Sequence, residues 1–314
     1  MDTVAFSHVP VLLTECIENL AVRQDGVYVD CTTGGGGHSY EIAKRLTGAG
    51  RLICIDRDTD ALEAAKIRLA DFSERITFVH SNFSQLESLL QSLQIDRVNG
   101  ILMDLGVSSY QLDNAERGFS YMQDAPLDMR MDRSATLTAY DVVNRYEKEE
   151  LCRILFDYGE EKFARNIAAS IVRQRAIKPI ETTLELAELI KASLPKAARE
   201  GGHHPAKRSF QAIRIEVNSE LSSIDDAIGA AVSALAPGGR LAIITFHSLE
   251  DRLVKSAFAA ASAGCTCPKN FPVCVCGNKP KIRLVSRKPI TATEQELQIN
   301  PRSRSAKLRV AEKL

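Results

Sequence analysis

Short apolar runs alternate with helical patterns between residues 26 and 106, and this alternation constrains the fold more than any other feature. The helical patterns cover about 38–46, 60–70 and 84–93. The runs that read as strands are Val27–Asp30, Arg51–Asp56, Arg75–Val79 and Val98–Asp104. Because a strand, a helix and a further strand normally form a right-handed parallel crossover, we expect an open, doubly wound, mostly parallel α/β sheet.

The pattern changes in the second half of the chain. Residues 136–207 contain no convincing strand, and helical spacing dominates. A long helix is expected over 209–235, ended by the turn signal Ala236-Pro237-Gly238-Gly239. A strand over 240–246, a helix over 248–261 and strands near 282–286 and 306–311 should complete the sheet. We therefore expect one discontinuous α/β domain, residues 1–135 and 208–314, interrupted by an all-helical inserted domain, residues 136–207.

Charge is distributed unevenly, although the 314 residues carry a formal net charge of zero. From Gly264 to the end there are eleven Lys or Arg against three Glu, so this segment is about +8 and the rest about −8. The asymmetry suits nucleic-acid binding, although a solvated basic tail explains it equally well. No apolar run approaches the roughly 20 residues of a membrane helix, and the start lacks signal-peptide features. We expect a cytoplasmic protein without a membrane segment.

Four consecutive glycines, Gly34 to Gly37, follow the first expected strand. Glycine lets the backbone turn sharply and approach a ligand closely, and open α/β sheets bind ligands at this edge. Asp56 ends the second strand, where a carboxylate can accept hydrogen bonds from ribose hydroxyls. Together these residues predict a site for a dinucleotide or for S-adenosylmethionine. A dinucleotide fingerprint would need Gly or Ala where Ser39 stands.

Two further residues are expected at the same edge. Asp104 ends the fourth strand, next to the point where the strand order reverses, although a lone Asp there also serves as a helix cap. His247 follows the fifth strand. For His247 two interpretations stay open: assistance in proton transfer, or a hydrogen bond to backbone.

Motifs along nearly the whole chain resemble those of the bacterial small-subunit ribosomal RNA (cytosine-N4)-methyltransferase family, the methyltransferase H family. Many long motifs in the same order make this resemblance highly specific. The motifs are His8–Leu13, Thr33–Ser39, Met103–Ser109, Gln111–Asp113, Arg117–Ser120, Pro126–Asp132, Gly159–Glu161, Phe210–Arg214, Phe246–Arg252 and Asn300–Arg309.

The resemblance implies a Rossmann-like methyltransferase that uses S-adenosylmethionine to methylate N4 of a cytidine in 16S ribosomal RNA, near the decoding region. It implies the small ribosomal subunit and its RNA as partners, not DNA; a homodimer is compatible with it. By resemblance the cofactor site would consist of Gly34, Gly36, Gly37, His38, Asp56, Phe83, Asp104 and Gln111. Asp104 is our candidate for the acceptor of the N4 hydrogen, with His247 as a second candidate catalytic residue. Methylation at carbon 5 needs a cysteine nucleophile, and the loop Asp104–Ser109 has none.

Basic residues and a cluster of cysteines suggest RNA contacts and a metal site. The basic residues proposed for phosphate contacts are Lys162, Arg165, Arg173, Arg302 and Arg304, and a solvated face is the equally good alternative. Cysteines at Cys265, Cys267, Cys274 and Cys276 form two C-x-C pairs without an adjacent histidine. Because this spacing is less diagnostic than paired C-x-x-C motifs, we do not expect structural zinc; a metal there would order a loop.

Two alternative functions are also compatible with the sequence. One is a methyltransferase that acts on a protein or a small molecule. The other is a ribosome assembly factor that senses the cofactor without catalysis. An intact Asp104 beside an intact glycine loop argues against the second.

Overall fold

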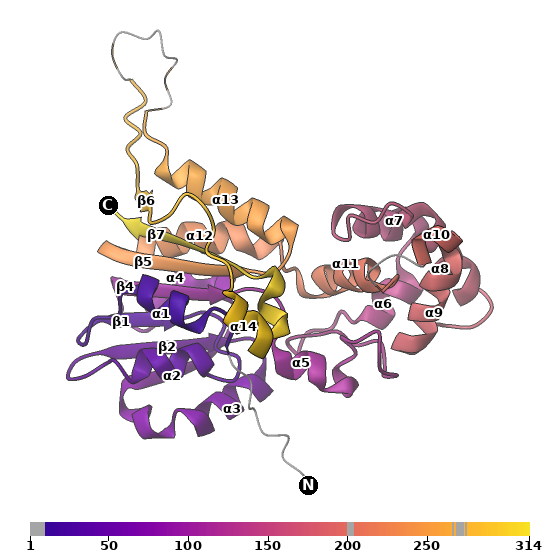
Figure 1. Ribbon diagram of the computed structural model, residues 1–314, viewed down its shortest axis with the longest axis horizontal. Coiled ribbons are helices and arrows are strands. Elements are labelled where there is room, and N and C mark those ends of the chain that lie inside the picture. Colours follow the sequence, from indigo (N-terminus) through magenta and orange to yellow (C-terminus); the bar gives the residue numbers. More distant parts are fainter. Residues whose placement is uncertain (1–9, 200–203, 266, 268–272, 274) are drawn as a thin grey trace. The chain divides into compact units, whose positions relative to one another are not determined.

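The chain divides into two compact units, which are described separately below (Figure 1). The first unit consists of Met1–Gly106 and Leu221–Leu314, and the second of Val107–Glu220. The helical insert expected over 136–207 falls inside the second unit. The computed structural model describes residues 10–199, 204–265, 267, 273 and 275–314.

A seven-stranded sheet forms the first unit, and it confirms the expected doubly wound, mostly parallel α/β fold. Its order is β3-β2-β1-β4-β5-β7-β6, and β1 to β5 run parallel, whereas β7 is antiparallel to β5 and β6. The strands are β1 (Val27–Asp30), β2 (Arg51–Asp56), β3 (Ile76–His80), β4 (Val98–Asp104), β5 (Leu235–Thr245), β6 (Ile282–Leu284) and β7 (Lys307–Lys313). The order reverses between β1 and β4, so their carboxyl ends flank the expected ligand edge.

Helices cover both faces of this sheet, which explains why its strands read as continuous apolar runs. Alternate residues of β2 illustrate the division: Ile53 belongs to one buried cluster and Cys54 to the other. The first cluster contains residues of α4 (Leu86–Ser92), α12 (Ser222–Ala234) and α13 (Ser248–Ser262). The second contains residues of α1 (Leu13–Leu20), α2 (Gly37–Ala43) and α3 (Thr59–Arg68). Between β6 and β7 the chain forms α14 (Glu294–Ile299) and the 3-10 helix η4 (Pro301–Ser305).

The prediction of a single long helix over 209–235 is wrong. The chain forms two helices there, α11 (Lys207–Asn218) and α12, because Ser219 adopts a left-handed backbone with φ of 49°. The buried Glu220 then accepts hydrogen bonds from Arg214, at 2.9 and 3.0 Å, and this pair holds the end of α11. The residues expected to form a turn after the helix instead belong to β5, where the pairing with β4 shifts register between Leu235 and Arg240.

In the described residues of the second unit the regular structure is helical, apart from an isolated bridge between Pro126 and Thr182. Besides α11 they are α5 (Ser109–Asp113), η3 (Ala115–Arg117), α6 (Ala139–Arg145), α7 (Lys148–Asp157), α8 (Ala164–Arg175), α9 (Thr183–Ser193) and α10 (Lys196–Arg199). They bury a core of their own, so this unit has the packing of an independent domain. Across the described ranges of the chain, no helix is both long and apolar enough to cross a bilayer.

Candidate active site

The glycine loop joins β1 to α2 and needs glycine for two different reasons. Gly34 and Gly36 have φ of +52° and +74°, a region that residues with a side chain rarely adopt. Gly37 has an ordinary φ, but a Cβ atom there would lie 2.2 Å from Cγ of Pro10. The loop is therefore held tightly against the segment that precedes α1.

Asp56, the expected ribose ligand, lies at the carboxyl end of β2 and holds the glycine loop. Its Oδ2 accepts the backbone N–H of Gly34 at 2.7 Å, and its Oδ1 accepts that of Asp58 at 2.9 Å. Burial raises the pKa of Asp56, although these two hydrogen bonds oppose the shift. A carboxylate has about four lone-pair positions, so two remain for hydroxyl donors.

Asp30, which ends β1, anchors the loop from the other side. Its Oδ2 accepts the hydroxyl of Ser39 at 2.6 Å, and its Oδ1 accepts the backbone N–H of Thr32 at 3.1 Å. Asp30 is 1% exposed, and burial raises its pKa to about 6. Sequence reasoning did not select Asp30 or Ser39. The only signal was an acid at the end of the first strand, directly before the glycines.

Asp104 lies at the end of β4, next to β1, and its carboxylate is incompletely bonded. The backbone N–H of Asp104 donates to Oγ1 of Thr32 at 2.6 Å, which fixes the strand end beside the loop. Its Oδ1 is buried and has no hydrogen-bond partner among the described residues. Burial raises the pKa of Asp104 well above its ordinary value, and the charges of Asp30 and Glu250 raise it further. A buried oxygen without a partner is costly unless a ligand supplies a donor.

The structure brings His38 together with Asp104. Nε2 of His38 donates to the carbonyl oxygen of Val11 at 3.1 Å, so Nδ1 carries the lone pair in the neutral ring. Nδ1 lies 3.9 Å from Oδ2 of Asp104. Burial lowers the pKa of His38 to about 4, so the ring is neutral at pH 7 and does not act as a counter-ion. Within the described residues, Asp104 makes no ion pair with Lys or Arg.

His247 is the N-cap of α13, where its ring accepts a hydrogen bond from the backbone; a role of His247 in proton transfer stays a prediction. The N–H of Glu250 donates to Nδ1 of His247 at 3.5 Å, and Oε2 of Glu250 accepts the N–H groups of Phe246 and His247. Nε2 of His247 lies 3.1 Å from Oε1 of Glu250 without forming a hydrogen bond. Glu250 itself is 1% exposed and was not selected from the sequence.

The remaining expected cofactor residues occupy different environments. Phe83 begins the 3-10 helix η2 (Phe83–Gln85) after β3 and packs in the first buried cluster of the sheet. Gln111 belongs to the second unit, where it is buried in the first turn of α5. Its Oε1 accepts the N–H of Ser108 at 3.0 Å, and its own N–H donates to the Ser108 hydroxyl at 3.2 Å. This reciprocal pair is a capping box.

The basic residues expected to contact RNA are exposed in their own units. Lys162 precedes α8, and Arg165 and Arg173 lie on it. Arg302 and Arg304 lie on η4 of the first unit. Two basic residues that follow η4 form ion pairs within the protein: Lys307 and Arg309 both pair with Asp251, at 3.0 and 2.7 Å. The sequence alone did not reveal these ion pairs.

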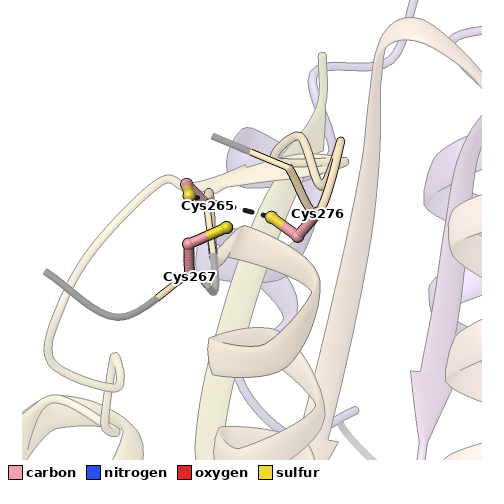
Figure 2. A group of neighbouring side chains, drawn as sticks. All are labelled: Cys265, Cys267 and Cys276. Atoms are coloured by element: carbon pink, nitrogen blue, oxygen red, sulfur yellow. Dashed lines mark hydrogen bonds between the residues drawn. The ribbon is translucent and has the colours of Figure 1, made fainter. Parts of the chain in front are cut away.

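Three of the four cysteines considered for zinc come together after α13 (Figure 2). The sulfur atoms of Cys265, Cys267 and Cys276 all lie within 4.8 Å of one another. Cys274 lies outside the described residues.

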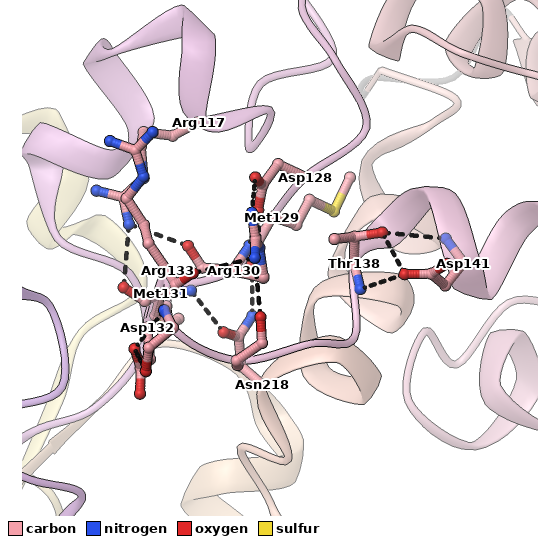
Figure 3. A network of polar contacts seen from close by, with 12 residues as sticks. Arg117, Asp128, Met129, Arg130, Met131, Asp132, Arg133, Thr138, Asp141 and Asn218 are labelled. Atoms are coloured by element: carbon pink, nitrogen blue, oxygen red, sulfur yellow. Dashed lines mark hydrogen bonds and ion pairs between the residues drawn. The ribbon is translucent and has the colours of Figure 1, made fainter.

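The motif Pro126–Asp132, among the most specific of the resemblance, forms a polar network in the second unit (Figure 3). Asp128 receives two hydrogen bonds from the Arg130 guanidinium, at 2.8 and 2.7 Å. Asn218 of α11 accepts the N–H of Met131 and donates to the carbonyl of Met129, each at 2.7 Å. Met129 has φ of 57°, so the network holds the backbone in a strained conformation. Within this unit the motif has a structural role.

Comparison with known proteins agrees with the resemblance. The MraW methylase family model matches residues 5–314. A protein named ribosomal RNA small subunit methyltransferase H from Paenibacillus sp. (strain JDR-2) is 59% identical over 315 residues, which cover 98% of this chain and 100% of the relative. Proteins of the same name from Clostridium botulinum (strain Kyoto / Type A2) and Brevibacillus brevis are 59% and 55% identical, covering 98% and 100% of this chain and 99% and 100% of the relatives. The match spans nearly the whole sequence, so this chain belongs to the MraW methylase family and is a methyltransferase.

Proposed function

We propose that this methyltransferase transfers a methyl group from S-adenosylmethionine to N4 of a cytidine in 16S ribosomal RNA, near the decoding region. The buried and unpartnered Oδ1 of Asp104 carries this proposal, because it offers an acceptor where the strand order reverses. The names of the relatives support RNA of the small ribosomal subunit as the substrate class.

The residues of the first unit fit the proposed methyl donor. Bound S-adenosylmethionine supplies an electrophilic methyl group on a positively charged sulfonium. Asp104 pairs with no Lys or Arg among the described residues, and the acids Asp30 and Glu250 add negative potential, so the edge favours a cationic ligand. Asp56 retains acceptor positions for ribose hydroxyls, and the loop that it holds lets the backbone approach the ligand.

Asp104 also suits the chemistry at an exocyclic amine. The N4 lone pair of cytosine is delocalised into the ring, so the amine is a weak nucleophile. Oδ1 of Asp104 accepts an N4 hydrogen, which favours the sp3 form, and takes the proton when the N–C bond forms. The raised pKa makes the ionised carboxylate a stronger base than an ordinary Asp. Neutral His38 leaves that charge uncompensated before the donor binds.

The state of Cys31, a cysteine at this edge, favours nitrogen over carbon 5 as the atom that is methylated. Cys31 follows β1, is 2% exposed, and its pKa is raised well above the ordinary value by burial and by Asp30. At neutral pH it is therefore a protonated thiol rather than the thiolate that attack on carbon 6 requires.

Substrate recognition is assigned to exposed basic residues. The phosphates would be contacted by exposed basic residues of each unit: Lys162, Arg165 and Arg173 in the second unit, and Arg302 and Arg304 on η4 of the first. Such contacts position the RNA without reading its sequence. Because the target is a large folded RNA, we expect the assembled subunit to be methylated better than the naked RNA.

The test uses small subunits from cells that lack the modification, incubated with the protein and isotopically labelled S-adenosylmethionine. Nucleosides from the digested RNA are separated by mass spectrometry. Labelled N4-methylcytidine is the expected product, and naked 16S RNA should give less of it. Label in 5-methylcytidine would overturn the target atom. Absence of label, with donor binding confirmed by calorimetry, would overturn the proposed substrate and leave a methyltransferase for another substrate or a non-catalytic binder.

A further inference from the structure

Three thiols that the proposed methyl transfer does not use come together in the first unit. They lie between α13 and β6, and Figure 2 shows Cys265, Cys267 and Cys276 pointing toward one another. Their sulfur atoms all lie within 4.8 Å of one another, and those of Cys265 and Cys276 are 3.7 Å apart. In a tetrahedral zinc thiolate, with Zn–S bonds of about 2.3 Å, neighbouring sulfurs are about 3.8 Å apart. We propose that these three cysteines bind one zinc ion as thiolates.

The backbone around the thiols is arranged as a metal–thiolate loop requires. The N–H of Val275 donates to the sulfur of Cys267 at 3.4 Å, and the N–H of Asn278 donates to that of Cys276 at 3.5 Å. Such donors stabilise negative charge on sulfur and orient it toward the metal. Zinc binding replaces three S–H protons, which pass to solvent, and leaves a fourth position for water or another ligand.

The two arms that carry the thiols are already joined at their base. The side chain of Asn278 donates to the carbonyl oxygens of Ala263 and Gly264, at 3.3 and 2.8 Å. The backbone N–H of Lys281 donates to the carbonyl of Ala261 at 2.8 Å. The polypeptide therefore holds the ligand-bearing segments side by side, which lowers the entropy lost when the metal binds.

The position of the cluster indicates a structural ion. Helix α13 starts after the carboxyl end of β5 and runs 15 residues back along the sheet, about 22 Å at 1.5 Å per residue. The cysteines follow its last turn and so lie far from the edge that carries Asp104. Zinc there would cross-link the segment after α13 to the segment before β6, and it would take no part in methyl transfer. Cys274 lies outside the described residues, and the proposal does not depend on it.

A disulfide is the competing use of these thiols. The 3.7 Å between the sulfurs of Cys265 and Cys276 exceeds the disulfide bond length of about 2.05 Å, so these two sulfurs are not bonded to each other. Three convergent sulfurs also leave one thiol unused in a disulfide, whereas a metal uses all three.

Cobalt titration of the full-length reduced protein, after chelator treatment, tests the proposal. One Co²⁺ per chain should bind, with a thiolate-to-cobalt charge-transfer band, and one equivalent of Zn²⁺ should abolish the band. The triple variant C265S/C267S/C276S should lose the band. The single variant C276S should weaken binding by more than about tenfold. C152S is the matched control, because Cys152 is the other thiol in the described residues that is not fully buried.

Three results would overturn the proposal. The first is the absence of a charge-transfer band in the reduced wild-type protein. The second is a band of unchanged intensity in the triple variant, with its fold verified by circular dichroism. The third is complete conversion of Cys265 and Cys276 to a disulfide in a reducing glutathione buffer that contains zinc. Metal content measured by mass spectrometry gives a readout independent of methyl transfer, so failure here leaves the proposed function untouched.

Discussion

Asp104 and Asp128 are both partly buried carboxylates that follow apolar segments, yet their surroundings differ in kind. Burial alone would raise the pKa of Asp128, but the hydrogen bonds and charge of Arg130 outweigh it and hold the pKa below its ordinary value. Asp104 has no such cation, one of its oxygens is unpartnered, and its pKa is raised well above the ordinary value. A satisfied carboxylate stabilises the structure around it. A carboxylate with an unpartnered oxygen instead favours the binding of a ligand that supplies a hydrogen-bond donor.

Among the substitutions that test this difference between the two carboxylates, Asp104→Asn should have the largest effect on activity. The amide cannot take a proton, so methyl transfer should fall by about 100-fold or more. Because the change removes a charge that the fold does not compensate, the free energy of unfolding should stay the same or rise. Single-turnover transfer and urea unfolding measure the two quantities. Activity within a few-fold of wild type would remove Asp104 from the chemistry.

Asp128→Asn should give the opposite result. The variant loses the charged pair with Arg130, whose two side chains are each about one quarter exposed. The free energy of unfolding of the second unit should fall by about 1.5–3 kcal/mol, a typical value for hydrogen bonds to charged groups. Hydrogen exchange of α6 and α11, followed by mass spectrometry, localises the change. Equal destabilisation of the first unit would show that the contrast between the two carboxylates is false.

The pH dependence of stability should carry the signature of Asp30. Its pKa is about 6 in the folded chain against 3.8 ordinarily, so the folded state binds this proton more tightly. Stability from this group is therefore complete below about pH 4 and is lost as the pH rises to above 6. The contribution of Asp128 to stability depends on pH in the opposite direction. Because its pKa is lowered in the folded chain, Asp128 stabilises the fold at pH values above its ordinary pKa, and this stabilisation is lost as the pH falls.

Asp30→Asn tests that sign with a smaller effect. Between pH 4 and 7.5 the free energy of unfolding in urea should decline less steeply in the variant than in wild type, because the variant lacks one of the carboxyl groups whose pKa is raised by folding. Asp60→Asn, on the first turn of α3, is a control for a general loss of negative charge. A decline as steep in D30N as in wild type would contradict the assignment.

The sequence predicted the sheet well because apolar strands buried on both faces leave a clear local pattern. The bounds of β1, β2 and β4 agree with it residue for residue. The break at Ser219 escaped prediction, because its left-handed backbone and the Arg214–Glu220 pair reflect tertiary contacts rather than local propensity. The long β5 escaped for a similar reason, since its first residue pairs with Val98.

The candidate site was only partly predictable. Asp56 and Asp104 stand at strand ends, where fold rules alone direct attention. Asp30 and Glu250 raise the pKa of Asp104 only because folding brings three acids together from distant positions in the chain. Likewise, the C-x-C spacing gave weak support for a metal, whereas the folded chain brings three of the sulfurs together.

The pH dependence of kcat/KM for the methyl donor tests the central claim most directly, because it reports groups that titrate before the donor binds. An ionised Asp104 is required, and its pKa lies above the ordinary range, so the rate should rise with pH along a limb well above pH 3.9. In D30N this limb should move to lower pH, because one of the charges that raises the pKa of Asp104 is removed. A limb that stays near the ordinary value of an Asp, about 3.9, and does not move in D30N would contradict the account of Asp104 as the proton acceptor.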